Sequence, residues 1–207
     1  SKGFRIFAME SGFANALDTE RWLATGEGSL DGAMTGLDQL WRTEEYRDLL
    51  QWMRDWNAEA PEGERLHLVG LDPQIHAGEA AARLQAWLER VDAETAADVA
   101  PVLVRLGALA DLDAFDLEGL LEVVDGLRER AAPEEWADQR QLLVVLQQRH
   151  RAVRLEGLEA YAFRDSCMAD NARWVLRRWP GARAVVSAHN GHVSRAGLFE
   201  VPGAEPV

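Results

Sequence analysis

The run FRIFAME at residues 4–10 indicates a β-strand near the start of this chain. Its apolar residues are followed by the turn-forming pair Ser11-Gly12, which is typical of a buried strand that ends at Glu10. Two later runs have the same character: LHLVGLD at 66–72 and ARAVVSA at 182–188. Long helical patterns separate the three runs, so we expect parallel strands joined by crossover helices.

The intervals between these strands have helical periodicity. Apolar spacing predicts a helix that begins at Glu44 after a Thr43 cap, and further helices over 78–90 and 165–179. Three or four more are expected between residues 95 and 156. We therefore expect an α/β fold, with a small, mostly parallel sheet flanked by helices and a helical insertion or cap between the second and third strands.

Three parts of the chain follow from this pattern. They are a first part of the α/β core at 1–94, the helical insertion or cap at 95–156, and the remainder of the α/β core at 157–207. Three strands make a small sheet, and the first of them begins very close to Ser1. We therefore expect the chain to be a fragment of a larger domain.

Composition narrows the range of partners. Lys and Arg total 22 against 35 for Asp and Glu, and a net charge of −13 repels phosphate backbones, so we expect no nucleic-acid partner. No apolar run reaches the roughly 20 residues of a membrane helix, so we expect no membrane partner and a cytoplasmic location. Secretion stays open, because the natural N-terminus can precede Ser1.

The single cysteine, Cys167, excludes an internal disulfide framework and a cysteine-based zinc site. The sequence leaves the oligomeric state open.

Ionisable residues stand at the ends of all three predicted strands. These are Glu10, Asp72, and the pair His189 and His192 in AHNGH at 188–192. Open α/β sheets bind ligands beyond the carboxyl ends of their strands, so we expect these side chains to converge there. A carboxylate beside an imidazole can activate water as a general base. A structural interpretation stays open for each residue alone, because Asn-Gly and Asp-Pro form turns and Glu10 can cap a helix.

Other residues have weaker signals. Arg164 and Asp165 form either a helix cap with an ion pair, or a guanidinium site for a carbonyl or carboxylate. We expect His67 in the core and His150 on a solvated helix face. The chain has no Gly-x-Ser-x-Gly elbow, Walker loop or dinucleotide fingerprint, which argues against serine α/β-hydrolases and nucleotide-binding proteins. A metal site built on the His-x-x-His pair is a minor alternative, because no zincin helix is present.

Five segments together resemble the erythromycin esterase family, which includes members from succinoglycan biosynthesis loci. In the family's order they are GFRIFAMESG (3–12), LWRTEEYRDLLQWMRDWNAE (40–59), LVGLDPQ (68–74), FRDSCMADNARWVL (163–176) and VVSAHNGHVSR (185–195). They span nearly the whole chain, although residues 95–156 carry little of the match. Each motif alone is modest, and the combination is specific.

The resemblance implies hydrolysis of a carboxylic ester, with opening of a macrolide lactone as the best-known reaction. It implies water activated by histidine, with no metal or other cofactor, and a small-molecule ester or lactone as the partner. The catalytic positions that it implies are Glu10, His189 and His192. The supporting or substrate-binding positions are Arg42, Asp72, Arg164 and Asp165.

One family segment does not occur in these 207 residues. It is a Gly-Glu-x-x-His-Gly segment that carries the family's proposed general-base histidine, upstream of the first matched strand. We therefore expect the chain alone to lack hydrolase activity and the full-length gene product to have it. Two alternatives stay open: a haem- or metal-binding protein of related architecture that uses His189 and His192, and a non-catalytic member that acts in polysaccharide assembly.

Overall fold

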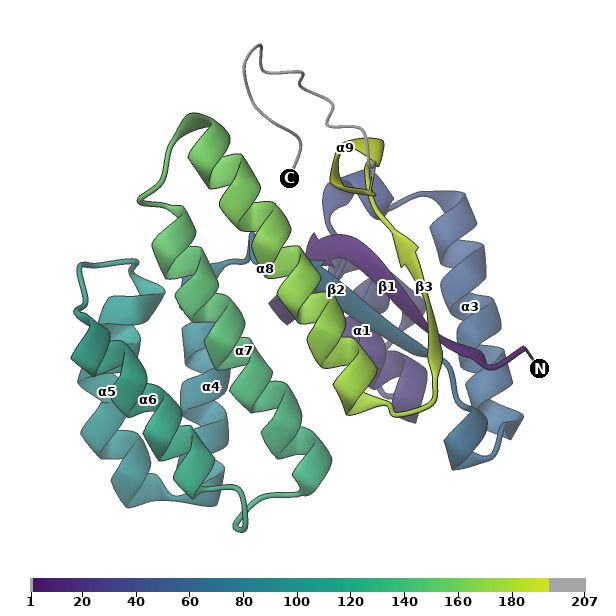
Figure 1. Cartoon of the computed structure of the whole chain (residues 1–207). Coiled ribbons are helices and arrows are strands. Elements are labelled where there is room, and N and C mark those ends of the chain that lie inside the picture. Colours follow the sequence, from purple (N-terminus) through teal and green to yellow (C-terminus); the bar gives the residue numbers. More distant parts are fainter. Residues whose placement is uncertain (1, 194–207) are drawn as a thin grey trace.

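The computed structural model describes residues 2–193, and its three strands form one parallel sheet (Figure 1). The sheet has the order β2-β1-β3, with β1 at Phe4–Gly12, β2 at His67–Asp72 and β3 at Arg183–Ser187. The predicted α/β class is therefore confirmed. The part of the last expected segment at 194–207 lies outside the described residues.

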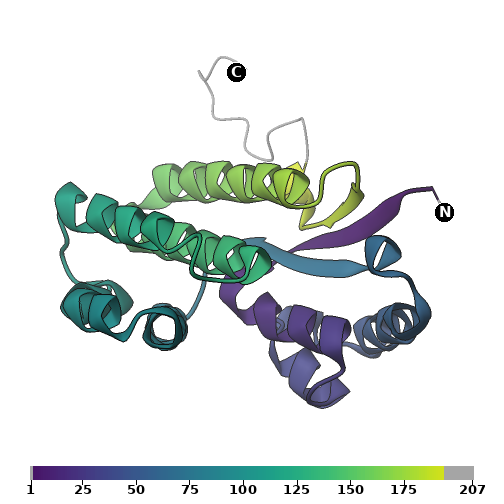
Figure 2. The same ribbon diagram turned by 90° about the horizontal axis from the view of Figure 1, so that it is seen from below.

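Helices cover both faces of the sheet (Figure 2). The crossover from β1 to β2 contains α1 (Phe13–Thr25), α2 (Leu30–Thr35) and α3 (Glu44–Glu59), with short 3-10 turns at Gln39–Trp41 and Glu62–Glu64. The crossover from β2 to β3 begins with α4 (Ala77–Val91) and ends with α8 (Gly157–Arg178), which packs on the opposite face from α1. A single turn of helix, α9 (Asn190–Val193), follows β3.

Three helices form the predicted insertion between the second and third strands. They are α5 (Ala93–Gly107), α6 (Ala114–Gly126) and α7 (Pro133–Ala152). The side chains of Asp92 and Asp113 cap the first two by accepting hydrogen bonds from backbone N–H groups. The helices pack on α4 and α8 beside the β2 edge of the sheet (Figure 1). The block is thus an insertion at the side of the sheet.

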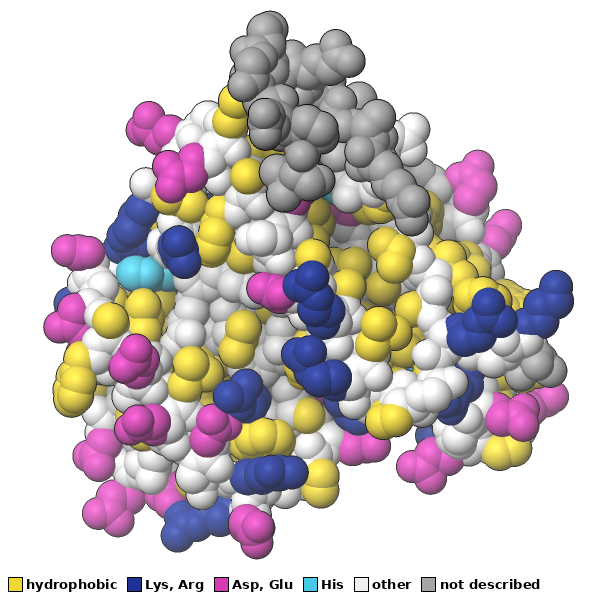
Figure 3. All heavy atoms as spheres, viewed as in Figure 1, with side chains coloured by type: hydrophobic (Ala, Val, Ile, Leu, Met, Phe, Trp, Pro, Cys, Tyr) yellow, Lys and Arg dark blue, Asp and Glu magenta, His cyan; other side chains and the backbone are white. Residues whose placement is uncertain are grey.

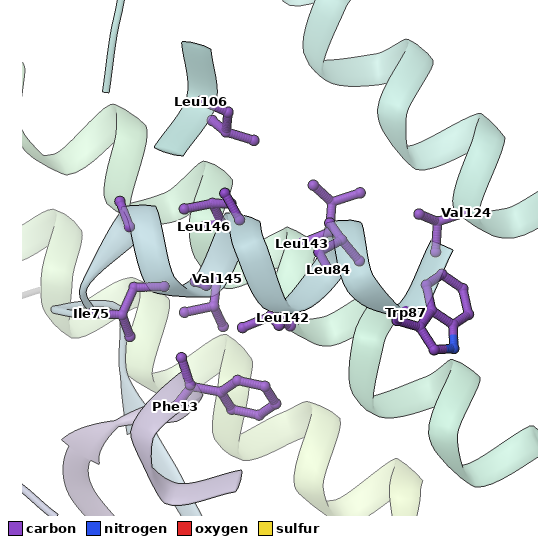
Figure 4. Packing of buried hydrophobic residues seen from close by; sticks show 14 of the residues in the cluster. Phe13, Ile75, Leu84, Trp87, Leu106, Val124, Leu142, Leu143, Val145 and Leu146 are labelled. Atoms are coloured by element: carbon purple, nitrogen blue, oxygen red, sulfur yellow. The ribbon is translucent and has the colours of Figure 1, made fainter. Parts of the chain in front are cut away.

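The sheet separates two hydrophobic cores. Alternate residues of β1 point to opposite faces, so Ile6 joins the larger core and Met9 the smaller one. The larger core fills the space between α4 and α7, where Trp87 and Leu142 are buried (Figure 4). The smaller core lies under α1 to α3, and includes Leu23. Burial on both faces explains why β1 is apolar without interruption from Ile6 to Met9.

The β3 edge of the sheet is much less covered than the β2 edge. Val185 and Val186 are 47% and 49% exposed, whereas β2 is buried from Leu68 to its end. Hydrophobic side chains gather over β3 on the face shown in Figure 3. Among residues 2–193, no helix combines the length and the apolar character needed to cross a membrane.

Candidate active site

The ends of β1 and β2 bring Glu10 and Asp72 to the same edge of the sheet. β1 is the central strand, with β2 on one side of it and β3 on the other. Open α/β sheets bind ligands at the carboxyl ends of the strands where the chain switches from one side of the sheet to the other. The loop after α2 holds the end of β1 in place. There Trp41 Nε1 donates a hydrogen bond to the carbonyl oxygen of Glu10 at 2.6 Å, and Gly12 N–H donates to Asp38 Oδ2 at 3.0 Å.

Gly70 allows β2 to approach β1 closely just before both strands end. A Cβ atom at this position would lie 2.5 Å from the carbonyl oxygen of Ser11 and 2.7 Å from that of Gly12. Both neighbours are backbone atoms, so a larger residue would require the strands to move apart. The register of β1 shifts in this region, between Met9 and Gly12. The glycine of the Gly-x-Asp pattern therefore sets the position of Asp72 relative to the end of β1.

Arg164, on α8, joins the two carboxylates. Its Nε lies 3.1 Å from Asp72 Oδ1, its Nη2 lies 2.8 Å from Glu10 Oε1, and Nη2 also donates to Asp72 Oδ2. The side chains of Arg164, Glu10 and Asp72 are 18%, 13% and 4% exposed, so the ions are largely removed from water. Such buried charges persist only when each is paired and hydrogen-bonded.

This pairing keeps both partners charged. Burial raises the pKa of Glu10, but the backbone N–H of His189 at 2.7 Å and the Arg164 guanidinium lower it by more, so the pKa lies below its usual value. Burial lowers the pKa of Arg164, but the carboxylates of Asp72 and Glu10 raise it above its ordinary value. Both oxygens of Glu10 already accept hydrogen bonds. Glu10 is therefore suited to holding other groups, and poorly suited to accepting a proton from water.

His192, on α9, contacts the ion network through both ring nitrogens. Its Nδ1 lies 2.5 Å from Asp165 Oδ1, and its Nε2 lies 3.0 Å from Arg164 Nη1 and 3.2 Å from Glu10 Oε1. A neutral ring with its proton on Nδ1 donates to Asp165 and accepts from Arg164. A protonated ring can donate from Nε2 to Glu10 instead. The surroundings therefore provide a partner for either protonation state, although the side chain is only 6% exposed.

His189 differs from His192 in both exposure and tautomer. It is exposed, and its Nδ1 accepts a hydrogen bond from Gly191 N–H at 3.1 Å. An imidazole nitrogen accepts only when it carries no proton, so neutral His189 carries its proton on Nε2. Its own backbone N–H donates to Glu10. The side chain therefore presents an N–H donor to solvent beside the carboxylate network.

Six of the seven residues singled out in the sequence lie in this cluster: Glu10, Asp72, Arg164, Asp165, His189 and His192. Arg42 lies elsewhere. Its Nε and Nη2 donate to the carbonyl oxygens of Leu37 and Thr35 at 2.8 Å and 3.0 Å. Among the described residues, no hydrogen bond or ion pair joins Arg42 to the other six, so its visible role is to brace the loop before α3.

Two residues of the site escaped the sequence analysis. Tyr161 stacks on His192, with ring centroids 5.1 Å apart and an interplanar angle of 19°. Trp41 anchors Glu10 through its backbone. The available signal for Tyr161 was its spacing of three and four residues from Arg164 and Asp165, which places all three on one face of a helix. That signal was missed because the helix was expected to begin only at Asp165.

A comparison with family models gives the decisive match. The model described as erythromycin esterase matches residues 1–201. The chain belongs to the erythromycin esterase family. No curated protein matches this chain.

Solved structures share the fold of this erythromycin esterase family chain at low identity. A Bacillus cereus protein is 21% identical with a TM-score of 0.73, and a succinoglycan biosynthesis protein is 20% identical with a TM-score of 0.74; each match covers 96% of this chain and 52% of the other. A mutant of the erythromycin esterase EreC in its open conformation is 17% identical, with a TM-score of 0.56, and covers 91% and 53%. This family member thus spans about half the length of the solved proteins it matches.

Proposed function

We propose that this chain is part of a hydrolase that opens a carboxylic ester or a macrolide lactone with water. The observation that carries the proposal is the position of His192, with Asp165 at one ring nitrogen and the Glu10–Arg164 pair at the other. Membership of the erythromycin esterase family supports the same reaction class. The proposed partner is a small-molecule ester.

Ester hydrolysis requires a donor for the oxyanion and groups that move two protons. A water oxygen attacks the carbonyl carbon, and the carbonyl oxygen becomes an oxyanion. In our proposal, the exposed Nε2–H of His189 donates a hydrogen bond to that oxygen. The carbon–oxygen bond to the leaving group then breaks, and the alkoxide takes up a proton.

His192 is the proposed proton carrier. It can take up a proton at Nε2, because Asp165 stabilises the resulting imidazolium through Nδ1 and Glu10 can accept the new N–H. It gives this proton to the alkoxide and recovers one from the histidine that deprotonates the attacking water. We propose that this second histidine is the one in the Gly-Glu-x-x-His-Gly segment of the full-length protein, because a protonated His192 has no free nitrogen to accept the water proton and His189 is held as a donor.

Haem or metal ligation by the two histidines is less consistent with these contacts. Both nitrogens of His192 already have partners, and one of them is a cationic guanidinium. Within residues 2–193, no three His, Cys, Asp or Glu side chains are grouped so that they could hold a metal ion. We therefore propose no second function.

The test uses the full-length protein with erythromycin and 4-nitrophenyl acetate as substrates. Lactone opening is followed by mass spectrometry as the addition of one water, and ester cleavage by absorbance. We expect His189→Ala to reduce kcat about 100-fold or more, as loss of an oxyanion donor does in other hydrolases. Glu129→Gln, at an exposed position outside the cluster, is the control and should leave kcat unchanged. Wild-type protein that hydrolyses neither ester, or full activity in the His189 variant, would contradict the proposal.

A further inference from the structure

Three side chains of α8 contact the ring of His192. Tyr161, Arg164 and Asp165 lie three and four residues apart, so they share one face of the helix. Asp165 contacts Nδ1, Arg164 contacts Nε2 and Tyr161 covers a face of the ring. The imidazole is therefore held at both of its edges and on one of its faces by a single helix.

The hydrogen bonds and the stacked ring restrain different motions. Bonds at Nδ1 and Nε2 fix the imidazole within its own plane. They oppose only weakly a tilt about the line through the two nitrogens, because small tilts change neither distance by much. The Tyr161 ring lies at a centroid distance of 5.1 Å and is inclined by only 19°, so a tilt toward it is blocked. The stack thus supplies the restraint that the hydrogen bonds lack.

Tyr161 is half-buried and lies outside both hydrophobic cores. Burial and the charge of Asp165 raise the pKa of its phenol above the ordinary value.

We propose that Tyr161 is a positioning residue, whose stacked ring holds the His192 imidazole so that Nε2 faces Glu10 and Arg164. This proposal deepens the proposed hydrolytic function and rests on it only for the effect on turnover. The aromatic ring carries the role, so phenylalanine should replace tyrosine and an aliphatic residue should not.

The first measurement is independent of hydrolysis. The ring protons and nitrogens of His192 are followed by NMR in the histidine-labelled chain, and are assigned by their loss in His192→Gln. In wild type and in Tyr161→Phe, we expect the ring protons to be shifted upfield by the stacked ring. In Tyr161→Leu, we expect that shift to disappear and the nitrogen resonances to move toward the average of exchanging tautomers. Phe163→Leu is the matched control, because this ring lies on α8 but packs over Arg151 with a guanidinium-to-centroid distance of 4.7 Å.

The second measurement is turnover in the full-length protein. We expect Tyr161→Leu to lower kcat about tenfold or more with little change in KM, because a misplaced proton carrier slows the chemical step. Tyr161→Phe should restore most of the wild-type value. Unchanged His192 nitrogen resonances in Tyr161→Leu, with the fold intact by circular dichroism, would overturn the inference, because the proton shifts change on loss of the ring alone. Altered resonances in a protein whose wild type hydrolyses no ester would support the positioning role and contradict only the proposed function.

Discussion

Nη2 of Arg164 lies 2.8 Å from Oε1 of Glu10, although 154 positions separate the two residues in the sequence. This contact joins the end of the first strand to the last long helix. The same guanidinium holds Asp72 at the end of the second strand. The site is therefore assembled only when both crossovers have folded onto the sheet, so that the stability of the chain and the geometry of the site depend on the same ion network.

Removal of the Arg164 charge should destabilise the chain strongly. Arg164→Gln leaves Glu10 and Asp72 as neighbouring, largely buried carboxylates without their cation. We expect the free energy of unfolding at pH 7 to fall by about 3–5 kcal/mol, the usual cost of breaking a buried ion pair from one side. Urea unfolding measures this. Arg173→Gln is the control, since its pair with Asp170 is 65% exposed and should contribute less than about 1 kcal/mol. Equal effects of the two substitutions would show that the network is not structural.

A methyl group at Gly70 should disturb the end of β1. Gly70→Ala places a carbon against the carbonyl oxygens of Ser11 and Gly12, so we expect a loss of about 1–3 kcal/mol in the free energy of unfolding. Turnover in the full-length protein should also fall, because Glu10 lies on the displaced segment. Gly119→Ala, in open space on α6, is the matched control and should be neutral or stabilising by up to about 1 kcal/mol. A neutral result at Gly70 would mean that the strands can separate without cost.

The pH dependence of stability should reflect Asp138, at the opposite end of the sheet. Burial raises the pKa of Asp138 from 3.8 to about 6, although Arg178 opposes the shift, and Glu20 and Glu134 add to it. The folded state then binds the proton more tightly than the unfolded state, so this carboxyl lowers stability as the pH rises from about 4 to 6. Asp138→Asn should flatten that slope and stabilise the chain at pH 8 by about 1 kcal/mol, a value reduced because 31% of the side chain is exposed. Thermal unfolding between pH 4 and 8 tests this, and an unchanged slope would contradict it.

The sheet could be predicted because both faces of its first strand are buried. The covered part of such a strand is apolar on both sides, as Ile6 to Met9 are, and such short runs between helical patterns have few alternatives. The class and the three strands were therefore correct. Strand ends then place Glu10 and Asp72 at one edge, since parallel strands have their carboxyl ends on the same side. The loop contacts that complete the site, such as that of Trp41 with Glu10, follow from no local pattern.

Helix boundaries and histidine environments were less predictable. The helix expected to begin at Asp165 begins at Gly157. The earlier start could not be predicted, because the side chain of Glu156 makes no capping hydrogen bond at the N-terminus of the helix. The prediction that His150 is solvated was wrong. The residue is 4% exposed and its Nε2 contacts the carbonyl oxygen of Ala110 at 2.8 Å. Charged neighbours in the sequence suggested a solvated face, whereas the burial comes from a turn 40 positions away.

Glu10 and His192 are proposed to act as one unit, and a double-mutant cycle on kcat/KM in the full-length protein measures the coupling between them. Glu10→Gln, His192→Gln and the double variant are compared for hydrolysis of the same ester. Because Glu10 is proposed to act through the imidazole, we expect the double variant to be scarcely slower than the slower single variant. If the losses in the two single variants multiply in the double variant, or if the Glu10 variant is as active as wild type, the two residues act independently.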